Sequence, residues 1–398
     1  MGYYYQVSRK DRNIGSPDMS ILEKTCHKVE KISEPQFLEM GIEWNNLLSE
    51  SDNNNIFLTH EWVASWWQVF KENKEFFSLT VRDENNELIG IAPLFIEKEK
   101  YFKFIPFTVV KFLGMNSVQP DYLGFIIKRG LEKVVIPSIV DALIKHQDQW
   151  DLLLFGDLTF GISSNDNLIQ TARQKGFLWH IDRNECPYLP LPQNEDEFYS
   201  HFKKKKRYNL KRQVRLLSDN FRYEYARGCR KDENHKLMDR LIYLHKNRAK
   251  SAQRGDAFHC PAIVKFHHLL VDQMFDKKWL MLYYIKLNDE IECCLYAFCY
   301  DQKFYFYQSG FNPRLAKYSL GSVIVLNTIL SAIGMNCREY DFLKGNEQYK
   351  FSWTKDIRIT ETLFVCRKSI KSFIYFYLIK LQRLCGKTVR AFRKRVSH

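Results

Sequence analysis

The sequence predicts an α/β (α+β) protein built as two related halves in tandem, each a mixed, mostly antiparallel sheet flanked by helices. Segments with apolar residues three or four positions apart, typical of helices, alternate with short apolar runs bounded by Asn, Asp or Gly, typical of strands. The two halves echo each other: VRDENNELIGIAPLF near residue 81 matches YIKLNDEIECCLYAF near residue 284, and WDLLLFGD near residue 150 matches EYDFLKGN near residue 339. We interpret these echoes as a duplicated domain.

The composition is that of a globular protein. Of the 398 residues, 45% are hydrophobic and 15% aromatic, which excludes a disordered chain, and the length suits two domains. No internal repeat of about 20–50 residues is present, which argues against solenoids and propellers. The expected organisation is a loose tail at 1–25, an N-terminal half at 26–190, a C-terminal half at 191–365 and a basic amphipathic tail at 366–398.

The N-terminal half begins with helical patterns and continues with strands. The expected elements are helix 34–49, a helix capped by Thr59, a hairpin of 77–82 and 88–97, helix 131–145, strand 151–155 and helix 165–175 ending at Gly176. Within the second helix, Trp62, Trp66 and Phe70 recur every fourth residue and lie on one face. We interpret this aromatic stripe as core.

Three prolines at positions 187, 190 and 192 mark the predicted boundary between the halves. The expected elements after it are a helix capped by Asn194, helix 232–250, a helix opened by Pro261, a meander of 280–287, 291–300 and 304–309, a helix beginning at Ser319 and a strand near Glu339. The stretch 303–353 therefore predicts a βαβ unit. Its helix start offers unpaired N–H donors and the positive end of a dipole, so an anionic cofactor arm can dock between Arg314 and Ser322.

A net charge of +14 suggests an anionic partner, and much of the excess is local. The segment 203–215 places Lys and Arg on one helix face, which is either a solvated surface or a contact for phosphate or acidic lipid. The tail mixes basic and apolar residues and is either a helix lying on an anionic membrane or a helix docked on the protein. Its most apolar part, 373–381, is too short to span a bilayer.

The sequence gives no sign of export. The N-terminus MGYYYQVSRK lacks the basic-then-apolar layout of a signal peptide, and the ten cysteines form no C-x-x-C pair or dense framework. We therefore expect buried thiols and a cytoplasmic protein, peripheral to the membrane if the tail binds lipid. No His/Cys spacing fits zinc, and neither a Walker loop nor a G-x-S-x-G elbow is present, so no metal is expected.

Several separated motifs resemble one enzyme superfamily. The motifs are Phe57-x-Thr-x-x-Trp62, Arg207-Tyr-Asn-Leu-Lys-Arg212, Gln308-Ser-Gly-Phe-Asn-Pro313, Tyr318-Ser-Leu-Gly321 and the run from Tyr340 to Lys350 followed by Trp353. They resemble GNAT acyltransferases, more specifically the cellulose-biosynthesis (CelD-type) acetyltransferase family, which is related to the FemAB-like aminoacyltransferases. The resemblance covers about residues 30–365. It departs from the general pyrophosphate loop at Lys317, where that loop has its first glycine.

The resemblance implies transfer of an acyl group, usually acetyl from acetyl-CoA, to an amine or hydroxyl of a small molecule, a saccharide or a cell-envelope precursor. The residues expected to bind the cofactor are Arg314, Lys317, Tyr318, Ser319, Gly321 and Ser322. One alternative is a FemAB-like aminoacyltransferase that draws on aminoacyl-tRNA and contacts RNA through 203–215. Another is a non-catalytic scaffold for an anionic ligand or membrane.

Four residues are the expected catalytic set. Asp341 and Glu347 are the acids nearest to the predicted corner and are candidates for the general base, and burial would raise the pKa of Asp341. Lys350 can stabilise charge, and Tyr307 can protonate the leaving thiolate. Structural alternatives stay open: a buried carboxylate at Asp341, a pair between Glu347 and Lys350, and a core tyrosine. His245 and Arg248 share a helix face and can line an acceptor site, or belong to an ordinary exposed helix.

Overall fold

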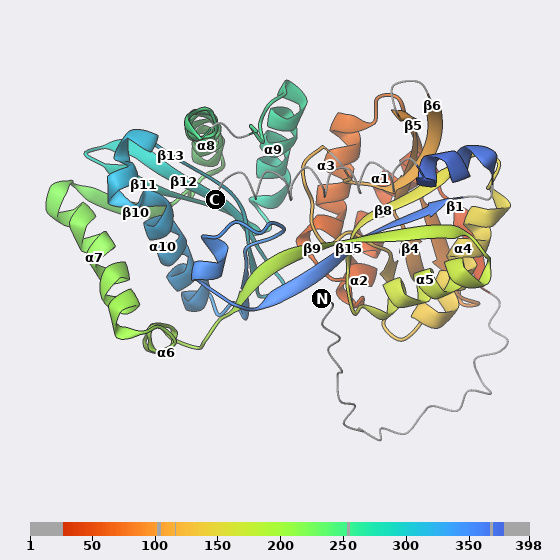
Figure 1. Ribbon diagram of the computed structural model, residues 1–398, viewed down its shortest axis with the longest axis horizontal. Coiled ribbons are helices and arrows are strands. Elements are labelled where there is room, and N and C mark those ends of the chain that lie inside the picture. Colours follow the sequence, from red (N-terminus) through yellow and green to blue (C-terminus); the bar gives the residue numbers. More distant parts are fainter. Residues whose placement is uncertain (1–26, 102–104, 116, 253–254, 367–368, 378–398) are drawn as a thin grey trace, which may run out of the picture.

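The computed structural model describes residues 27–101, 105–115, 117–252, 255–366 and 369–377 (Figure 1). The predicted loose tail at 1–25 lies outside the described residues. The helices are α1 (Glu34–Glu39), α2 (Gly41–Ser49), α3 (His60–Phe70), α4 (Glu132–Lys145), α5 (Ser163–Gln174), α6 (Glu195–Ser200), α7 (Lys204–Asn220), α8 (Lys231–Ser251), α9 (Pro261–Met274) and α10 (Leu320–Gly334), with 3₁₀ turns η2 (Ile56–Leu58), η3 (Pro313–Tyr318) and η4 (Lys350–Ser352).

The strands form two sheets. They are β1 (Lys28–Lys31), β2 (Lys74–Phe76), β3 (Leu79–Arg82), β4 (Leu88–Ala92), β5 (Leu94–Tyr101), β6 (Ile105–Phe112), β7 (Ile126–Ile127), β8 (Leu152–Thr159), β9 (Leu178–Pro190), β10 (Tyr223–Arg227), β11 (Leu280–Leu287), β12 (Glu290–Tyr300), β13 (Lys303–Phe311), β14 (Glu339–Asp341) and β15 (Ile357–Cys366). A four-stranded sheet has the order β1-β3-β4-β7, and an eleven-stranded sheet runs β10-β11-β12-β13-β14-β9-β15-β8-β6-β5-β2.

Two long strands, β9 and β15, join the halves. β9 follows the N-terminal elements, yet its last residues pair with β14 of the C-terminal half. β15 follows the C-terminal elements, yet it pairs with β8 of the N-terminal half and with β9 along its length. Figure 1 shows the two strands crossing the middle of the molecule together. The predicted boundary at residues 190 and 191 therefore falls at the end of a strand that pairs with both halves.

The hydrophobic core consists of two clusters, one that extends through both halves and one that belongs mainly to the C-terminal half. The strands β10 to β13 of the eleven-stranded sheet have α8 and α9 on one face and α10 with α7 on the other (Figure 1). The α8–α9 face belongs to a cluster that continues into the N-terminal half, and the α10 face forms a second cluster. The predicted aromatic stripe lies in the first: Trp62 and Trp66 are fully buried, and Trp62 contacts the rings of Phe266, Phe298 and Tyr307 from the other half.

The elements predicted from local patterns are present, with three differences. The helix expected at 34–49 is interrupted at Met40, between α1 and α2. The strand expected at 88–97 is divided at Pro93, where the chain passes from the small sheet to the large one. The helix expected from Asn194 is two helices, α6 and α7, because the chain turns at 201–203. Asn194 does cap the first of them, since its side chain accepts from the backbone N–H of Glu197.

The βαβ unit at 303–353 is confirmed. β13 and β14 pair in parallel, and α10 connects them. Ser319 precedes α10 as expected, but it adopts a left-handed conformation with φ of 56° and its side chain makes no capping hydrogen bond. Such a conformation is strained for a residue other than glycine, so it requires support from the surrounding structure.

The cysteines and the helices can be compared with two expectations from the sequence, buried thiols and no membrane-spanning segment. Within the described chain, Cys186, Cys293, Cys294, Cys337 and Cys366 are buried free thiols. Cys229 is exposed and two others are partly exposed, so the expectation of buried thiols is correct for the first group and wrong for Cys229. Among the described residues, no helix has the length and apolar character needed to cross a membrane.

We expect substitution of Trp62 by alanine to destabilise the whole molecule, because the ring fills space between the two halves. Loss of a fully buried tryptophan costs about 3–5 kcal/mol in free energy of unfolding. The measurement is urea unfolding followed by circular dichroism. Ile42→Ala serves as the control, since that side chain is 82% exposed and an exposed substitution changes stability by about 0.5 kcal/mol or less. Equal midpoints for the two variants would contradict the packing described.

Candidate active site

The two parallel strands of the βαβ unit part before the first of them ends. β14 pairs with β13 through Lys303–Tyr305 alone, whereas β13 continues to Phe311. The chain after β14 turns instead toward β9, where the N–H of Phe342 donates to the carbonyl of Pro187. The edge of β13 from residue 306 to 311 is therefore left without a strand partner on that side. Such an edge can hydrogen-bond an extended ligand as a strand would.

A cavity of about 250 Å³ lies at this opening and is bounded by the start of α10. We call it the helix cavity. Its lining includes Ser319 before α10, Gly321 and Ser322 in the first turn of α10, Phe311 from β13 and Trp353. The first turn of a helix leaves backbone N–H groups unpaired and carries a partial positive charge, so this wall suits an anionic group.

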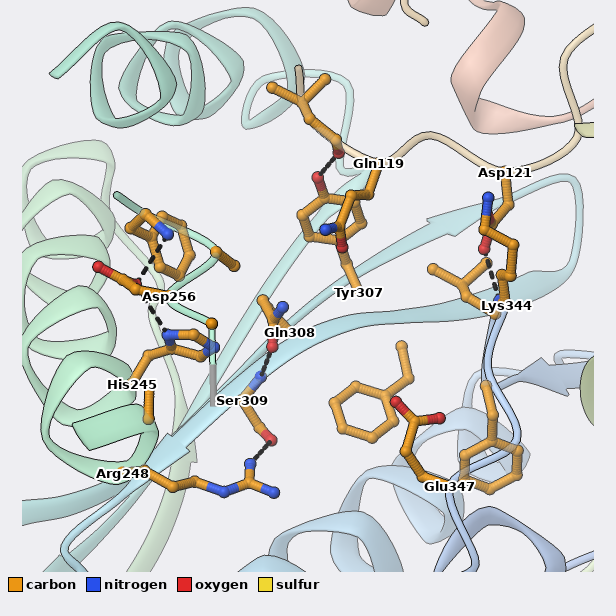
Figure 2. A pocket seen from close by; sticks show the side chains of 18 of the residues that line it. Gln119, Asp121, His245, Arg248, Asp256, Tyr307, Gln308, Ser309, Lys344 and Glu347 are labelled. Atoms are coloured by element: carbon orange, nitrogen blue, oxygen red, sulfur yellow. Dashed lines mark hydrogen bonds and ion pairs between the residues drawn. The ribbon is translucent and has the colours of Figure 1, made fainter. Parts of the chain in front are cut away.

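A larger cavity of about 310 Å³ adjoins the first, and we call it the central cavity (Figure 2). The two share Arg248, Phe306, Ser309 and Tyr349 in their walls. The central cavity is closed on one side by the loop 117–121 of the N-terminal half and on the others by residues of the C-terminal half. The two adjoining cavities therefore extend from the start of α10 to the interface of the halves.

The wall contributed by α8 depends on a glycine in β13. A Cβ atom at Gly310 would lie 2.6 Å from the backbone nitrogen of His245 and 2.9 Å from the carbonyl oxygen of Leu241. Only glycine allows the helix backbone to come this close to the strand. The close approach places His245 and Arg248 beside the open edge of β13, and Arg248 Nη1 lies 3.4 Å from Ser309 Oγ.

His245 forms a pair with an acid at the central cavity. Its Nδ1 lies 3.3 Å from Oδ1 of Asp256, and Figure 2 shows the ring between Asp256 and the side chains of Gln308 and Ser309. Burial lowers the pKa of His245, and Asp256 opposes that effect. The imidazole is therefore neutral near pH 7, and the nearby Asp256 carboxylate favours the tautomer with the proton on Nδ1, which leaves Nε2 as an acceptor. This arrangement is that of an oriented general base.

A second group of charges lies where the two halves meet. Asp121 is 3% exposed, and its Oδ2 accepts the backbone N–H of Lys344 at 2.6 Å. The Lys344 ammonium lies 2.7 Å from Asp157. Burial and the neighbouring Asp157 raise the pKa of Asp121 above its usual range, with Lys344 opposing the rise. A proton on Asp121 would thus be retained to higher pH than on an exposed carboxyl, at a position that lines the central cavity.

The loop that carries Asp121 is itself strained. Gln119 and Tyr122 have positive φ angles of 47° and 59°. Asn55 holds the loop in place, because its buried side-chain amide donates to the carbonyl of Tyr122 at 2.8 Å. Strained backbone held in place by buried hydrogen bonds is frequent at functional sites.

The predicted cofactor residues divide into two sets. Ser319, Gly321 and Ser322 line the helix cavity. Arg314, Lys317 and Tyr318 lie in η3 and are not among its lining residues, with Arg314 and Lys317 exposed to solvent. The Tyr318 ring instead packs against Phe221, with ring centroids 4.9 Å apart.

The predicted catalytic residues also separate. Asp341 is fully buried and lines neither cavity; its carboxylate binds Arg358 at 2.9 Å and the backbone N–H of Leu343 at 2.8 Å. Burial raises the pKa of Asp341, and Arg358 opposes the rise. Tyr307 lines the central cavity, but its hydroxyl donates to the carbonyl of Val118. These contacts correspond to the structural alternatives, a buried carboxylate and a core tyrosine.

Glu347 and Lys350 both line the central cavity and pair with each other at 3.0 Å. The Lys350 ammonium also donates to the carbonyls of Leu343 and Lys344. The lysine is thus engaged in holding the 343–350 loop, whereas the Glu347 carboxylate is about half exposed.

Sequence reasoning missed the parts of the site that come from the N-terminal half and from the loop before α9. Gln119, Asp121 and Asp256 belong to no recognisable motif, and nothing in the local pattern shows that they approach β13. The shared helix face of His245 and Arg248 was a usable signal, since both side chains line the central cavity. No group of three or more His, Cys, Asp or Glu side chains that could hold a metal ion occurs in the described part of the chain.

Comparison with known proteins agrees with this geometry. Residues 204–351 match the family model described as an acetyltransferase (GNAT) domain. The matched range contains α7 to α10, β10 to β14 and the residues that line the helix cavity except Ser352 and Trp353. Over this part of its length the chain is similar to a GNAT-type acetyltransferase domain, and the protein is an acyltransferase. A search of curated proteins found no match.

Solved structures resemble the chain over most of its length. The crystal structure of FemX is 11% identical with a TM-score of 0.59, and the match covers 84% of this chain and 96% of that one. A conserved protein of unknown function from Bacteroides thetaiotaomicron is 12% identical with a TM-score of 0.52, covering 85% and 99%. At this level of identity the likeness shows the fold alone. The predicted fold of two GNAT-like halves is confirmed.

We expect Gly310→Ala to displace α8, because the added methyl group would meet helix backbone and not a movable side chain. Overpacking of this kind costs about 1–3 kcal/mol in free energy of unfolding. Urea unfolding measures the loss. Gly334→Ala, at a position where a Cβ meets nothing within 4 Å, is the matched control. Equal stability of the two variants would show that α8 does not rely on this glycine.

Proposed function

We propose that the protein transfers an acyl group, in the first instance acetyl, from acyl-CoA bound in the helix cavity to an amine or hydroxyl acceptor in the central cavity. The single observation that carries the proposal is that the two cavities adjoin at the parted strands and share Arg248, Phe306, Ser309 and Tyr349 in their walls, with His245 in the wall of the central cavity. A donor thioester and an acceptor placed in the two spaces would meet beside Ser309.

The helix cavity suits the phosphate-bearing arm of acyl-CoA. The α10 start offers backbone N–H groups, and Gly321 leaves room for a pyrophosphate to approach. The unpaired edge of β13 can hydrogen-bond the amides of the pantetheine arm as a neighbouring strand would. Arg248, which lines both cavities, adds positive charge between them.

The chemistry requires a proton acceptor and a place for negative charge. His245 Nε2 takes the proton from the acceptor's amine or hydroxyl while the nitrogen or oxygen of the acceptor attacks the thioester carbonyl carbon. The carbonyl oxygen becomes an oxyanion, which N–H donors at the β13 edge can stabilise. The C–S bond then breaks, the CoA thiolate leaves, and the proton that His245 received passes to the thiolate, which restores the neutral imidazole. Asp256 keeps the other ring nitrogen protonated throughout and so orients the base.

The acceptor is proposed to be a small polar molecule, such as a saccharide or a cell-envelope precursor. The central cavity is small, and Gln119, Asp121, Gln308 and Glu347 give it hydrogen-bonding walls. This chemistry agrees with the resemblance to the cellulose-biosynthesis acetyltransferases. The eight described cysteines are free thiols, which supports placing the reaction in the reducing cytoplasm.

The aminoacyl-tRNA alternative has one observation in its favour. The side chains of Lys203, Lys204, Lys205, Lys211 and Arg212 are exposed at and along α7. Such a surface can contact an RNA backbone, but it can equally be a solvated helix face. We rank acyl-CoA first because the helix cavity does not involve that surface and the matched family model describes an acetyltransferase domain.

We expect acetyl-CoA to stabilise the protein in a thermal-shift titration and Gly321→Val to weaken its binding at least tenfold, because the added side chain would press on the Phe311 ring in the wall of the helix cavity. Gly334→Val, at the other end of the same helix, should bind like the wild type, since its side chain meets open space. Salt-sensitive binding of tRNA without a response to acetyl-CoA would favour the aminoacyltransferase. Binding of neither ligand would favour the scaffold.

We expect His245→Gln to lower kcat by about 10²–10⁴ fold, as for removal of a general base, with little change in the KM for acetyl-CoA. The measurement is thiol release from acetyl-CoA with a panel of amino sugars and sugar alcohols. His180→Gln is the matched control, because His180 also pairs with an acid, Asp182 at 3.0 Å, yet lines neither cavity. Equal loss in both variants would reject the assigned base.

The pH dependence gives a further check on the same residue. Burial lowers the pKa of His245, so the rate should fall on acidification only below the usual histidine value of about 6.5. Asp256 raises that pKa. Asp256→Asn should therefore move the acid limb to still lower pH while reducing kcat, and a move to higher pH would contradict the pairing.

A further inference from the structure

Residues 370–377 form a helix (Figure 1, dark blue). One face of this helix is buried and the other is exposed. Ser372 and Tyr375 are 0% and 2% exposed. The Tyr375 ring contacts Phe107 with centroids 4.7 Å apart, and the Lys371 ammonium lies 2.6 Å from the carboxylate of Asp151. The helix is thus docked on the N-terminal half. A docked helix was one of the two alternatives that the sequence left open for the tail.

The face that points away from the protein is apolar. Ile370, Phe373, Ile374 and Tyr377 are 82%, 43%, 48% and 60% exposed. Their spacing of three, one and three residues places them in one stripe along the helix. A scattered exposed apolar side chain is ordinary, but four large ones in a continuous stripe mark a contact surface.

The sequence around this face favours an anionic partner. Residues 378–398 contain seven Lys or Arg and no Asp or Glu, and the chain as a whole has a net charge of +14. A large apolar stripe distinguishes this surface from α7, where charge predominates. Apolar side chains next to many basic ones are the composition that binds the interface of a bilayer containing acidic lipids.

We propose that the apolar face of residues 370–377 inserts into the surface of an anionic membrane. The docked face then fixes the protein at a defined orientation, because Tyr375 and Lys371 tie the helix to the N-terminal half. The insertion is independent of the acyl-transfer proposal, since none of the four exposed side chains lines either cavity. It would bring the enzyme to acceptors assembled at a membrane.

The test is co-sedimentation of the full chain with phosphatidylcholine vesicles that contain or lack phosphatidylserine. The variant replaces Ile370, Phe373, Ile374 and Tyr377 with serine. We expect the wild type to bind vesicles with phosphatidylserine at least tenfold more tightly than neutral ones, and the variant to lose at least tenfold of that affinity. The melting temperature should be unchanged, because the replaced side chains are exposed.

The control replaces two exposed apolar residues elsewhere, Leu38 and Ile42, which are 49% and 82% exposed, and should bind like the wild type. Three outcomes overturn the proposal: unchanged binding by the serine variant, equal loss in the control, or no vesicle binding by the wild type. In the last case, a dimer that the serine variant abolishes in analytical ultracentrifugation would assign the face to a second copy of the chain.

Discussion

The site depends on the close contact between α8 and β13 at Gly310. The contact brings the α8 backbone close to β13, and so places His245 in the wall of the central cavity and Arg248 in the walls of both cavities. A side chain at this position would separate the helix from the strand. The separation of β13 and β14 opens the edge of β13 beside the cavities. Gly310 lets α8 approach β13, so that side chains of α8 line the cavities.

The two halves have different roles although their topology is related. The C-terminal half contains the parted strands, the α10 start and the His245–Asp256 pair. The N-terminal half supplies the wall at 117–121, held by Asn55 and by the ion cluster of Asp121, Asp157 and Lys344. Because β9 and β15 each pair across the division, strand hydrogen bonds hold the wall and the C-terminal half together.

Local patterns in the sequence were sufficient for the βαβ unit and for the three residues Ser319, Gly321 and Ser322, since a helix start and its flanking strands are specified within about 50 residues of chain. They were insufficient for β9 and β15, whose pairing joins residues such as Arg183 and Glu361, 178 positions apart. Asp341 was interpreted as a candidate base without knowledge of this pairing. Its partner Arg358 lies on β15, so the buried ion pair could not be seen before the strand was placed.

The most direct test of the account is hydrogen–deuterium exchange with and without saturating acetyl-CoA. If acyl-CoA lies along the open edge of β13 with its phosphates at the start of α10, backbone amides at 306–311 and 320–323 should exchange more slowly when it is bound. Amides of α7, outside both cavities, should be unaffected. Protection confined to α7, or no protection at either segment at saturation, would contradict the account.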